Sequence, residues 1–152
     1  MTDRPEELGT MENVIAPEYK AHMERTIGQG ICPFCEPDPK INVCIREGQH
    51  WMAWHNPFGY AHHRYHIILA TKVHCTEIDE LTPRMWVELG EFVTNITDEL
   101  DVRGGAVVMR FGDPKFTAST LRHLHMHIQV PDGSGPAFAV FCKNGFELKK
   151  DS

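Results

Sequence analysis

Residues 123–130 limit the possible folds of this chain more than any other segment. They read His-Leu-His-Met-His-Ile-Gln-Val, so polar and apolar side chains alternate without a break. Alternate side chains of a β-strand lie on the same face. The pattern therefore predicts a strand over about residues 122–130, with an apolar face for the core. The opposite face carries Gln129 and three histidines spaced roughly 6.5–7 Å apart. Neither bulk water nor an apolar core requires imidazoles in register, so this face indicates a metal or ligand site.

The remaining pattern predicts an α+β fold with a mainly antiparallel sheet, one long helix and a short N-terminal helix. The long helix should run from Pro83 to about Leu100, because Thr82 can cap it and proline is tolerated at a first helical position. The short helix should cover about residues 16–27. Further strands are expected at 41–46, 50–55, 65–71 and 106–111, a loop at 112–119, and a C-terminal hairpin of 137–142 with 146–149 around Lys143-Asn144-Gly145. The strand at 65–71 is apolar on both faces, as expected of a strand in the middle of the sheet.

The length of 152 residues fits one domain, which we place at residues 11–152 after a disordered tail at residues 1–10. The formal charge of −6 argues against a nucleic-acid binder with a broad positive surface. No apolar run is long enough for a membrane span, and residues 1–11 do not resemble a secretory signal. We therefore expect a cytoplasmic protein. Its five cysteines, an odd number in a reducing compartment, argue against a disulfide scaffold.

The alternating histidines match the signature of the histidine triad (HIT) family, and other segments resemble the same family. Residues 107–112 with 117–120 are similar to its strand and phosphate loop, and residues 66–69 with 72–74 to its central strand and the histidine that follows. Cys32-Pro33-Phe34-Cys35 resembles the zinc knuckle of its metal-bearing branch. The resemblance spans about residues 30–131. It implies the HIT fold and the small branch that includes phosphoramidases and diadenosine polyphosphate hydrolases.

The resemblance also implies a role for particular residues. His125 would be the nucleophile, with His127 beside a phosphate oxygen or the leaving group and His66 as a fourth active-site histidine. To attack phosphorus, His125 must be neutral, so its other ring nitrogen should donate to a backbone carbonyl. Gln129 departs from the family pattern, which leaves open a shifted register with His127 as the nucleophile. The predicted substrate-binding residues are Phe34, Asn56, Ser119, Thr120 and Gln129.

Two cysteines at the spacing of Cys32 and Cys35 can bind one metal ion, and a tetrahedral site then needs two more ligands. The resemblance implies His74 and His123 as those ligands, and a structural zinc ion (Zn2+). The alternatives are a redox-active pair and two thiols without a special role. A thioredoxin-like motif normally lies between a strand and a helix. Here the pair follows the end of a predicted helix and precedes a proline-rich turn, which favours zinc.

By resemblance, the expected activity is hydrolysis or transfer of a nucleotide. A nucleoside phosphoramidate or a dinucleoside polyphosphate would be cleaved at the α-phosphorus through a nucleotidyl-histidine intermediate. The expected substrate is an AMP-containing purine nucleotide, and the expected assembly is a homodimer. Three alternatives stay open at this point: a diadenosine polyphosphate phosphorylase, a metalloenzyme whose catalytic metal sits on the histidine strand, and a catalytically idle nucleotide-binding protein.

Overall fold

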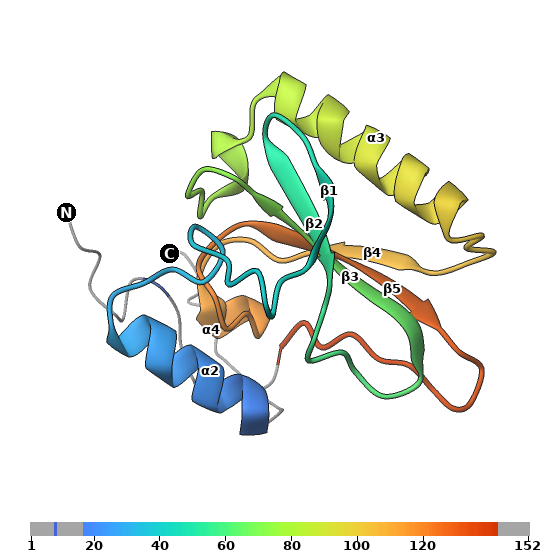
Figure 1. Ribbon diagram of the computed structural model, residues 1–152, viewed down its shortest axis with the longest axis horizontal. Helices are drawn as coiled ribbons and strands as arrows, with labels where there is room; N and C mark the ends of the chain where they lie inside the picture. The colour runs from blue at the N-terminus through green and yellow to red at the C-terminus, as the bar shows by residue number, and fades with distance from the viewer. Residues whose placement is uncertain (1–7, 9–16, 143–152) are drawn as a thin grey trace, which may run out of the picture.

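A five-stranded antiparallel sheet forms the centre of the fold. The structure is a computed structural model that describes Leu8 and residues 17–142 (Figure 1). The strand order is β1-β2-β3-β5-β4, and all four neighbouring pairs are antiparallel. The strands are β1 (Cys44–Glu47), β2 (Trp51–His55), β3 (His63–Thr71), β4 (Ala106–Met109) and β5 (His125–Pro131). The predicted α+β class is confirmed, and β3 lies at the middle of the sheet, as its apolar run indicated.

Helix α3 (Pro83–Glu99) covers one face of this sheet (Figure 1). Its predicted start is confirmed, because the Thr82 hydroxyl accepts a hydrogen bond from the Met85 backbone N–H at 3.3 Å and Pro83 occupies the first turn. The helix buries one apolar stripe against alternate residues of the strands. The resulting core contains Trp51, Ala53, Ile67, Leu69, Met85, Leu89, Phe92, Ile96, Leu124, Ile128 and Val130.

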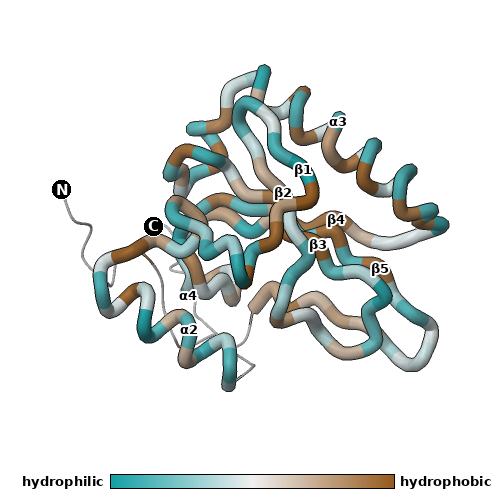
Figure 2. Tube along the Cα trace, in the orientation of Figure 1, coloured by the Kyte–Doolittle hydropathy of each residue, from teal (hydrophilic) through white to brown (hydrophobic). Residues whose placement is uncertain are grey.

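The opposite face of the sheet is covered by helix α2 (Pro17–Gly28) and the segment that follows it. A second apolar cluster forms here from residues of both layers, namely Leu8, Met23, Ile27, Cys32, Phe34, Trp54, Ile68, Ala70 and Leu121. In Figure 2 the apolar residues of the strands lie between the helices on the two sides. The histidine face of β5 therefore points toward α2 and not toward α3.

Several sequence predictions differ from the structure: β1 begins at Cys44 instead of residue 41, and β4 ends at Met109 instead of residue 111. The histidine strand begins at His125 instead of residue 122, because the preceding residues pair with the loop after β3: Leu124 N donates to Cys75 O at 2.7 Å. His123 thus lies just outside the strand. The predicted loop at 112–119 contains one helical turn, α4 (Pro114–Thr117), which Asp113 caps by accepting from Lys115 N at 2.9 Å.

Residues 137–142 form no strand, and the Val140 carbonyl is bonded to Arg110 instead of a partner strand. The other half of that predicted hairpin, at 146–149, lies outside the described residues. The predicted tail at 1–10 also lies outside the described residues, except for Leu8. Leu8 is 1% exposed, and its carbonyl accepts a hydrogen bond from Arg122 N at 2.7 Å.

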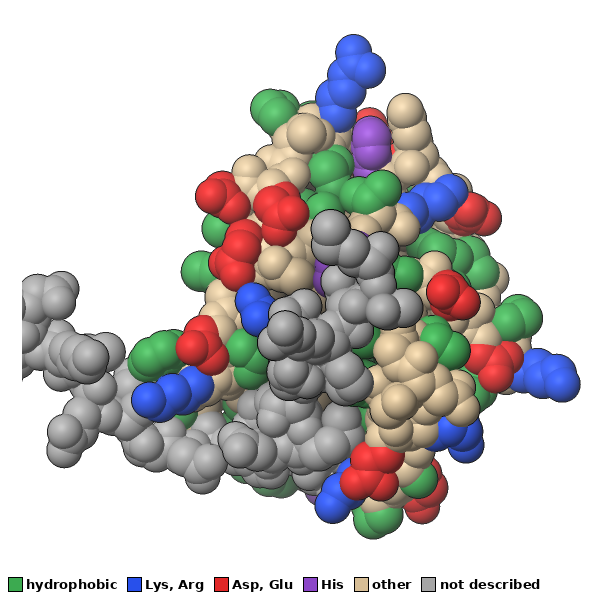
Figure 3. All heavy atoms as spheres, turned by 90° about the vertical axis from the view of Figure 1, so that its left-hand side faces the viewer, with side chains coloured by type: hydrophobic (Ala, Val, Ile, Leu, Met, Phe, Trp, Pro, Cys, Tyr) green, Lys and Arg blue, Asp and Glu red, His purple; other side chains and the backbone are tan. Residues whose placement is uncertain are grey.

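The remaining regular element is a 3-10 turn, η1 (Ile78–Glu80), between β3 and α3. Over the part of the chain that the structure describes, no helix is long and apolar enough to cross a membrane. On the face shown in Figure 3, basic and acidic side chains are interspersed and form no single basic patch.

Candidate functional site

Three histidines meet on the face of the sheet that α2 covers. His125 and His127 come from β5, and His66 comes from the neighbouring strand β3. His66 Nε2 lies 2.8 Å from His127 Nδ1, so the two rings share one hydrogen bond. The rings of His125 and His127 have their centroids 4.9 Å apart. The alternation of β5 and its register with β3 therefore bring together the three residues that the sequence nominated for catalysis.

The orientation of the His125 ring is fixed by a hydrogen bond to the backbone of His123. His125 Nδ1 lies 2.6 Å from the carbonyl oxygen of His123. A carbonyl can only accept, so Nδ1 carries the proton and donates it. In the neutral ring, Nε2 then keeps its lone pair. This is the tautomer that attack on phosphorus requires.

Burial keeps the histidine cluster neutral. Burial first, and the nearby His63 and Arg110 second, lower the pKa of His66 from 6.5 to about 4. Burial also lowers the pKa of His125 to about 4, although the hydrogen bond to His123 opposes the shift. The pKa of His127 is lowered well below its ordinary value by the same cause. At neutral pH all three rings are therefore uncharged, with one donor and one acceptor nitrogen each.

Asn56 lies against the ring of His66. Its side-chain oxygen accepts from Phe58 N at 2.9 Å, so its amide nitrogen faces His66, 3.4 Å from Nδ1 and 3.5 Å from Nε2. In the hydrogen bond between His66 Nε2 and His127 Nδ1, one of the two rings is the donor. When His66 donates, His127 carries its own proton on Nε2.

A cleft lies over His125 and His127, between the sheet, α2 and the loop before β5. Four of the five predicted substrate-binding residues line it. Phe34 packs edge-on against His125 with ring centroids 5.0 Å apart, and Asn56, Ser119 and Thr120 form other parts of the wall. Gln129 does not belong to the described lining, because its amide is turned toward His63 at 3.2 Å.

The loop before β5 forms one wall of the cleft through Ala118, Ser119 and Thr120. Ala118 has a left-handed backbone with φ 54°, a conformation that costs a non-glycine residue about 1 kcal/mol. The Ser119 hydroxyl donates to Leu121 O at 3.1 Å, and the Thr120 hydroxyl shares a 3.0 Å hydrogen bond with the Tyr19 hydroxyl. Burial raises the pKa of Tyr19 to about 12, so its phenol stays protonated.

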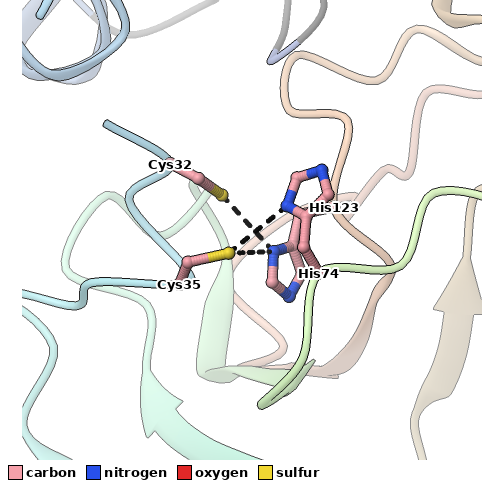
Figure 4. Close-up of side chains that lie close together, drawn as sticks. All are labelled: Cys32, Cys35, His74 and His123. Atoms are coloured by element: carbon pink, nitrogen blue, oxygen red, sulfur yellow. Dashed lines mark hydrogen bonds between the residues drawn. The ribbon is translucent and has the colours of Figure 1, made fainter. Parts of the chain in front are cut away.

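Beside the cleft, the side chains of Cys32, Cys35, His74 and His123 converge (Figure 4). Their four donor atoms all lie within 4.8 Å of one another. Cys32 Sγ and Cys35 Sγ are 3.3 and 3.5 Å from His123 Nδ1, and Cys35 Sγ is 3.3 Å from His74 Nδ1. Tetrahedral zinc bonds of standard length place sulfur and nitrogen roughly 3.5 Å apart, so the donor set fits a zinc ion.

The ring of His123 is also held in the tautomer that a metal requires. Its Nε2 donates to the Thr71 carbonyl oxygen at 2.7 Å and lies 3.0 Å from the Thr71 hydroxyl. The unprotonated Nδ1 therefore faces the two sulfur atoms, and such a partner on the outer nitrogen is typical of metal-bound histidine. His123 is 2% exposed, although it stands outside the strand.

Several residues of the cleft had no role in the sequence prediction. Tyr19 and His22 come from α2, and Tyr60 stacks on His66 with ring centroids 4.7 Å apart. Arg110 enters the cleft from the end of β4. Only Arg110 had a signal in the sequence, since it is a cation directly after an apolar strand and before the phosphate-type loop. The α2 residues are brought there by tertiary packing alone.

No protein-family model matches the sequence, and no curated protein matches it. Solved structures do resemble it. A HIT family hydrolase from Clostridium thermocellum aligns at TM-score 0.56 and 17% identity over 70% of this chain and 95% of that one. A HIT-like protein aligns at 0.53 and 17% over 66% and 95%. A histidine triad nucleotide-binding protein from Candida albicans aligns at 0.53 and 13% over 68% and 78%. The chain therefore has the fold of the histidine triad family.

Proposed function

We propose that this protein is a nucleotide hydrolase or nucleotidyl transferase that cleaves its substrate at the α-phosphorus, with His125 as the nucleophile. The observation that carries the proposal is the hydrogen bond from His125 Nδ1 to the His123 carbonyl, which leaves Nε2 as a free base beside the cleft. The fold shared with a HIT family hydrolase and with a histidine triad nucleotide-binding protein supports the same class of substrate.

The reaction would take place in two displacements. His125 Nε2 attacks the α-phosphorus, a P–N bond forms, and the bond to the leaving group breaks, with the electron pair passing to the leaving group. Water then attacks the same phosphorus, the P–N bond breaks, and a nucleoside monophosphate and a proton are released. Two displacements on a preorganised imidazole replace one difficult attack by water.

His127 would donate a hydrogen bond to the phosphate oxygens or to the leaving group. When His66 donates to its Nδ1, the Nε2–H of His127 is a donor beside the nucleophile. A neutral donor fixed where charge develops lowers the barrier without first having to lose a water shell. Ser119 and Thr120 stand on the other wall. The Thr120 N–H would bind the same oxygens, and the Ser119 N–H would do so in exchange for its 3.3 Å hydrogen bond to the Thr117 hydroxyl.

The rest of the nucleotide would occupy the apolar part of the cleft. Phe34 offers a ring for the base, and Asn56 stands where ribose hydroxyls can reach it. We further propose that Cys32, Cys35, His74 and His123 hold a structural zinc ion, which would fix Phe34 and the start of β5 together. A homodimer and a cytoplasmic location remain expectations.

The proposal is tested by supplying adenosine 5′-monophosphoramidate and diadenosine polyphosphates and following the products by chromatography. Wild-type protein should release AMP, and His125→Ala should lose at least about 1,000-fold in kcat/KM, as for removal of a covalent nucleophile. His50→Ala is the matched control, since His50 lies on the α3 side of the sheet.

A repeat in phosphate buffer separates the two acceptors. With adenosine 5′-monophosphoramidate as the donor, AMP as the product means that water accepts the nucleotidyl group, whereas ADP means that phosphate does. Equal turnover by wild type and His125→Ala would overturn the assignment of the nucleophile. Tight AMP binding with no turnover of any substrate would show a nucleotide-binding protein instead of an enzyme.

A further inference from the structure

Arg110 is a cation in the cleft that the proposed reaction does not use. It follows the last residue of β4 and lines the cleft together with His125 and His127. Its Nε and Nη2 both donate to the carbonyl oxygen of Val140, at 3.0 and 2.6 Å. The guanidinium also lies 6.0 Å from the centre of the Phe141 ring. The segment that follows β5 thus returns to the site and contacts the arginine through one backbone oxygen.

The described partners of Arg110 carry no negative charge. Among the described residues, no carboxylate lies within ion-pair distance of it. Its charge lowers the pKa of both His66 and His127, so it acts on the centre of the site and not only on its rim. Two parallel N–H groups of one guanidinium match a phosphate better than a single neutral carbonyl, and hydrogen bonds to an ionised acceptor are about twice as strong.

We propose that Arg110 binds the phosphate group next to the α-phosphate of the substrate, in place of its bond to Val140. This inference rests on the proposed function and narrows its substrate class. The preferred substrate is a nucleotide whose leaving group is itself a phosphate, as in a dinucleoside polyphosphate or another pyrophosphate-linked nucleotide. A phosphoramidate with an amine leaving group offers Arg110 no second anion and is the poorer substrate.

The first displacement explains why an arginine at this place matters. When His125 attacks, the bond between the α-phosphorus and the bridging oxygen breaks, and the electron pair and negative charge pass to the leaving phosphate. A guanidinium on that phosphate is bound more strongly as the charge grows, which lowers the barrier for this class of substrate. An amine leaving group instead needs a proton, which a guanidinium does not give up at neutral pH.

The test compares diadenosine triphosphate with adenosine 5′-monophosphoramidate in wild type, Arg110→Gln and Arg110→Lys. We expect Arg110→Gln to lower kcat/KM for the triphosphate about 10- to 100-fold more than for the phosphoramidate, as for loss of hydrogen bonds to a charged group. Arg110→Lys keeps the charge without the paired donors and should fall between. Arg84→Gln removes an equal charge from the α3 side and should leave the ratio of the two substrates unchanged.

Calorimetric binding of ADP and AMP gives a readout that does not depend on turnover. Wild type should bind ADP about 10-fold more tightly than AMP, and Arg110→Gln should lose most of that difference. Equal losses for both substrates and no ADP preference would overturn the inference, provided thermal melting shows the variant folded. If neither substrate is cleaved, the proposed reaction fails, and the ADP preference alone still decides the role of Arg110.

Discussion

The buried His66 ring should make the stability of the protein depend on pH. Its pKa is lowered from 6.5 to about 4 in the fold, and the groups around it, His63, Arg110, His125 and the Tyr60 ring, include no anion that would favour its charged form. When pH falls below 6.5, the unfolded chain binds a proton at this residue before the folded chain does. Stability is therefore complete above pH 6.5, falls as the pH drops toward 4, and loses nothing further from this residue below that.

The size of the effect follows from the shift. One unit of pKa difference corresponds to about 1.4 kcal/mol, so the fall between pH 7 and pH 5 is about 2 kcal/mol from His66 alone. The assay is guanidinium unfolding at both pH values, for wild type and His66→Gln. Other acid-sensitive groups act in both proteins, so the difference between the two pH responses isolates His66. Wild type should lose about 2 kcal/mol more than the variant. An equal loss in the two proteins would refute the reasoning.

Three further predictions address the metal site, the turn between β1 and β2, and the base pocket. Cys35→Ser should abolish the binding of one equivalent of zinc and lower the Tm, as measured by elemental analysis and thermal melting. The control Cys44→Ser, which alters an exposed thiol hydrogen-bonded to Arg46 O, should change neither. Zinc retained by Cys35→Ser would contradict the donor set. Glu88→Ala should lower the free energy of unfolding in guanidinium by about 2 kcal/mol, because the Glu88 carboxylate accepts hydrogen bonds from three backbone N–H groups of residues 49–51 at 2.6 to 2.9 Å. It should leave kcat/KM unchanged, because Glu88 lies on the α3 side of the sheet. Phe34→Leu should raise KM several-fold with a smaller change in kcat, because the ring that faces His125 is lost; a fall in kcat alone would place Phe34 in the chemistry instead.

Local patterns were enough to predict most of the fold. The Thr82 cap and the position of Pro83 define the start of α3, because both act within one helical turn. The apolar run within residues 65–71 indicated the central strand, because a strand covered on both faces buries side chains of both orientations, and residues 66–71 of β3 are all buried. The alternation in β5 placed His125 and His127 on one face, and that prediction required no knowledge of the neighbouring strands.

The predictions that failed depend on contacts between distant segments. His123 leaves the strand because Leu124 pairs with Cys75, far away in the sequence. Residues 137–142 are irregular, and the Val140 carbonyl accepts a hydrogen bond from Arg110 instead of from a neighbouring strand. Tyr19 reaches the cleft only because α2 packs across the sheet, which no local period encodes. The metal donors were predicted from the resemblance, and the structure brings them within reach of one ion.

The central claim is that His125 carries the nucleotide during turnover. The most direct test is rapid acid-free quenching of the reaction with a dinucleoside polyphosphate, followed by intact-protein mass spectrometry and peptide mapping. We expect a transient mass increase of one nucleotidyl group, located on His125 and absent from His125→Ala. The same adduct on His127, with His125→Ala still labelled, would show that the shifted register is the correct one. Turnover at full rate with no adduct on any histidine would contradict the covalent mechanism.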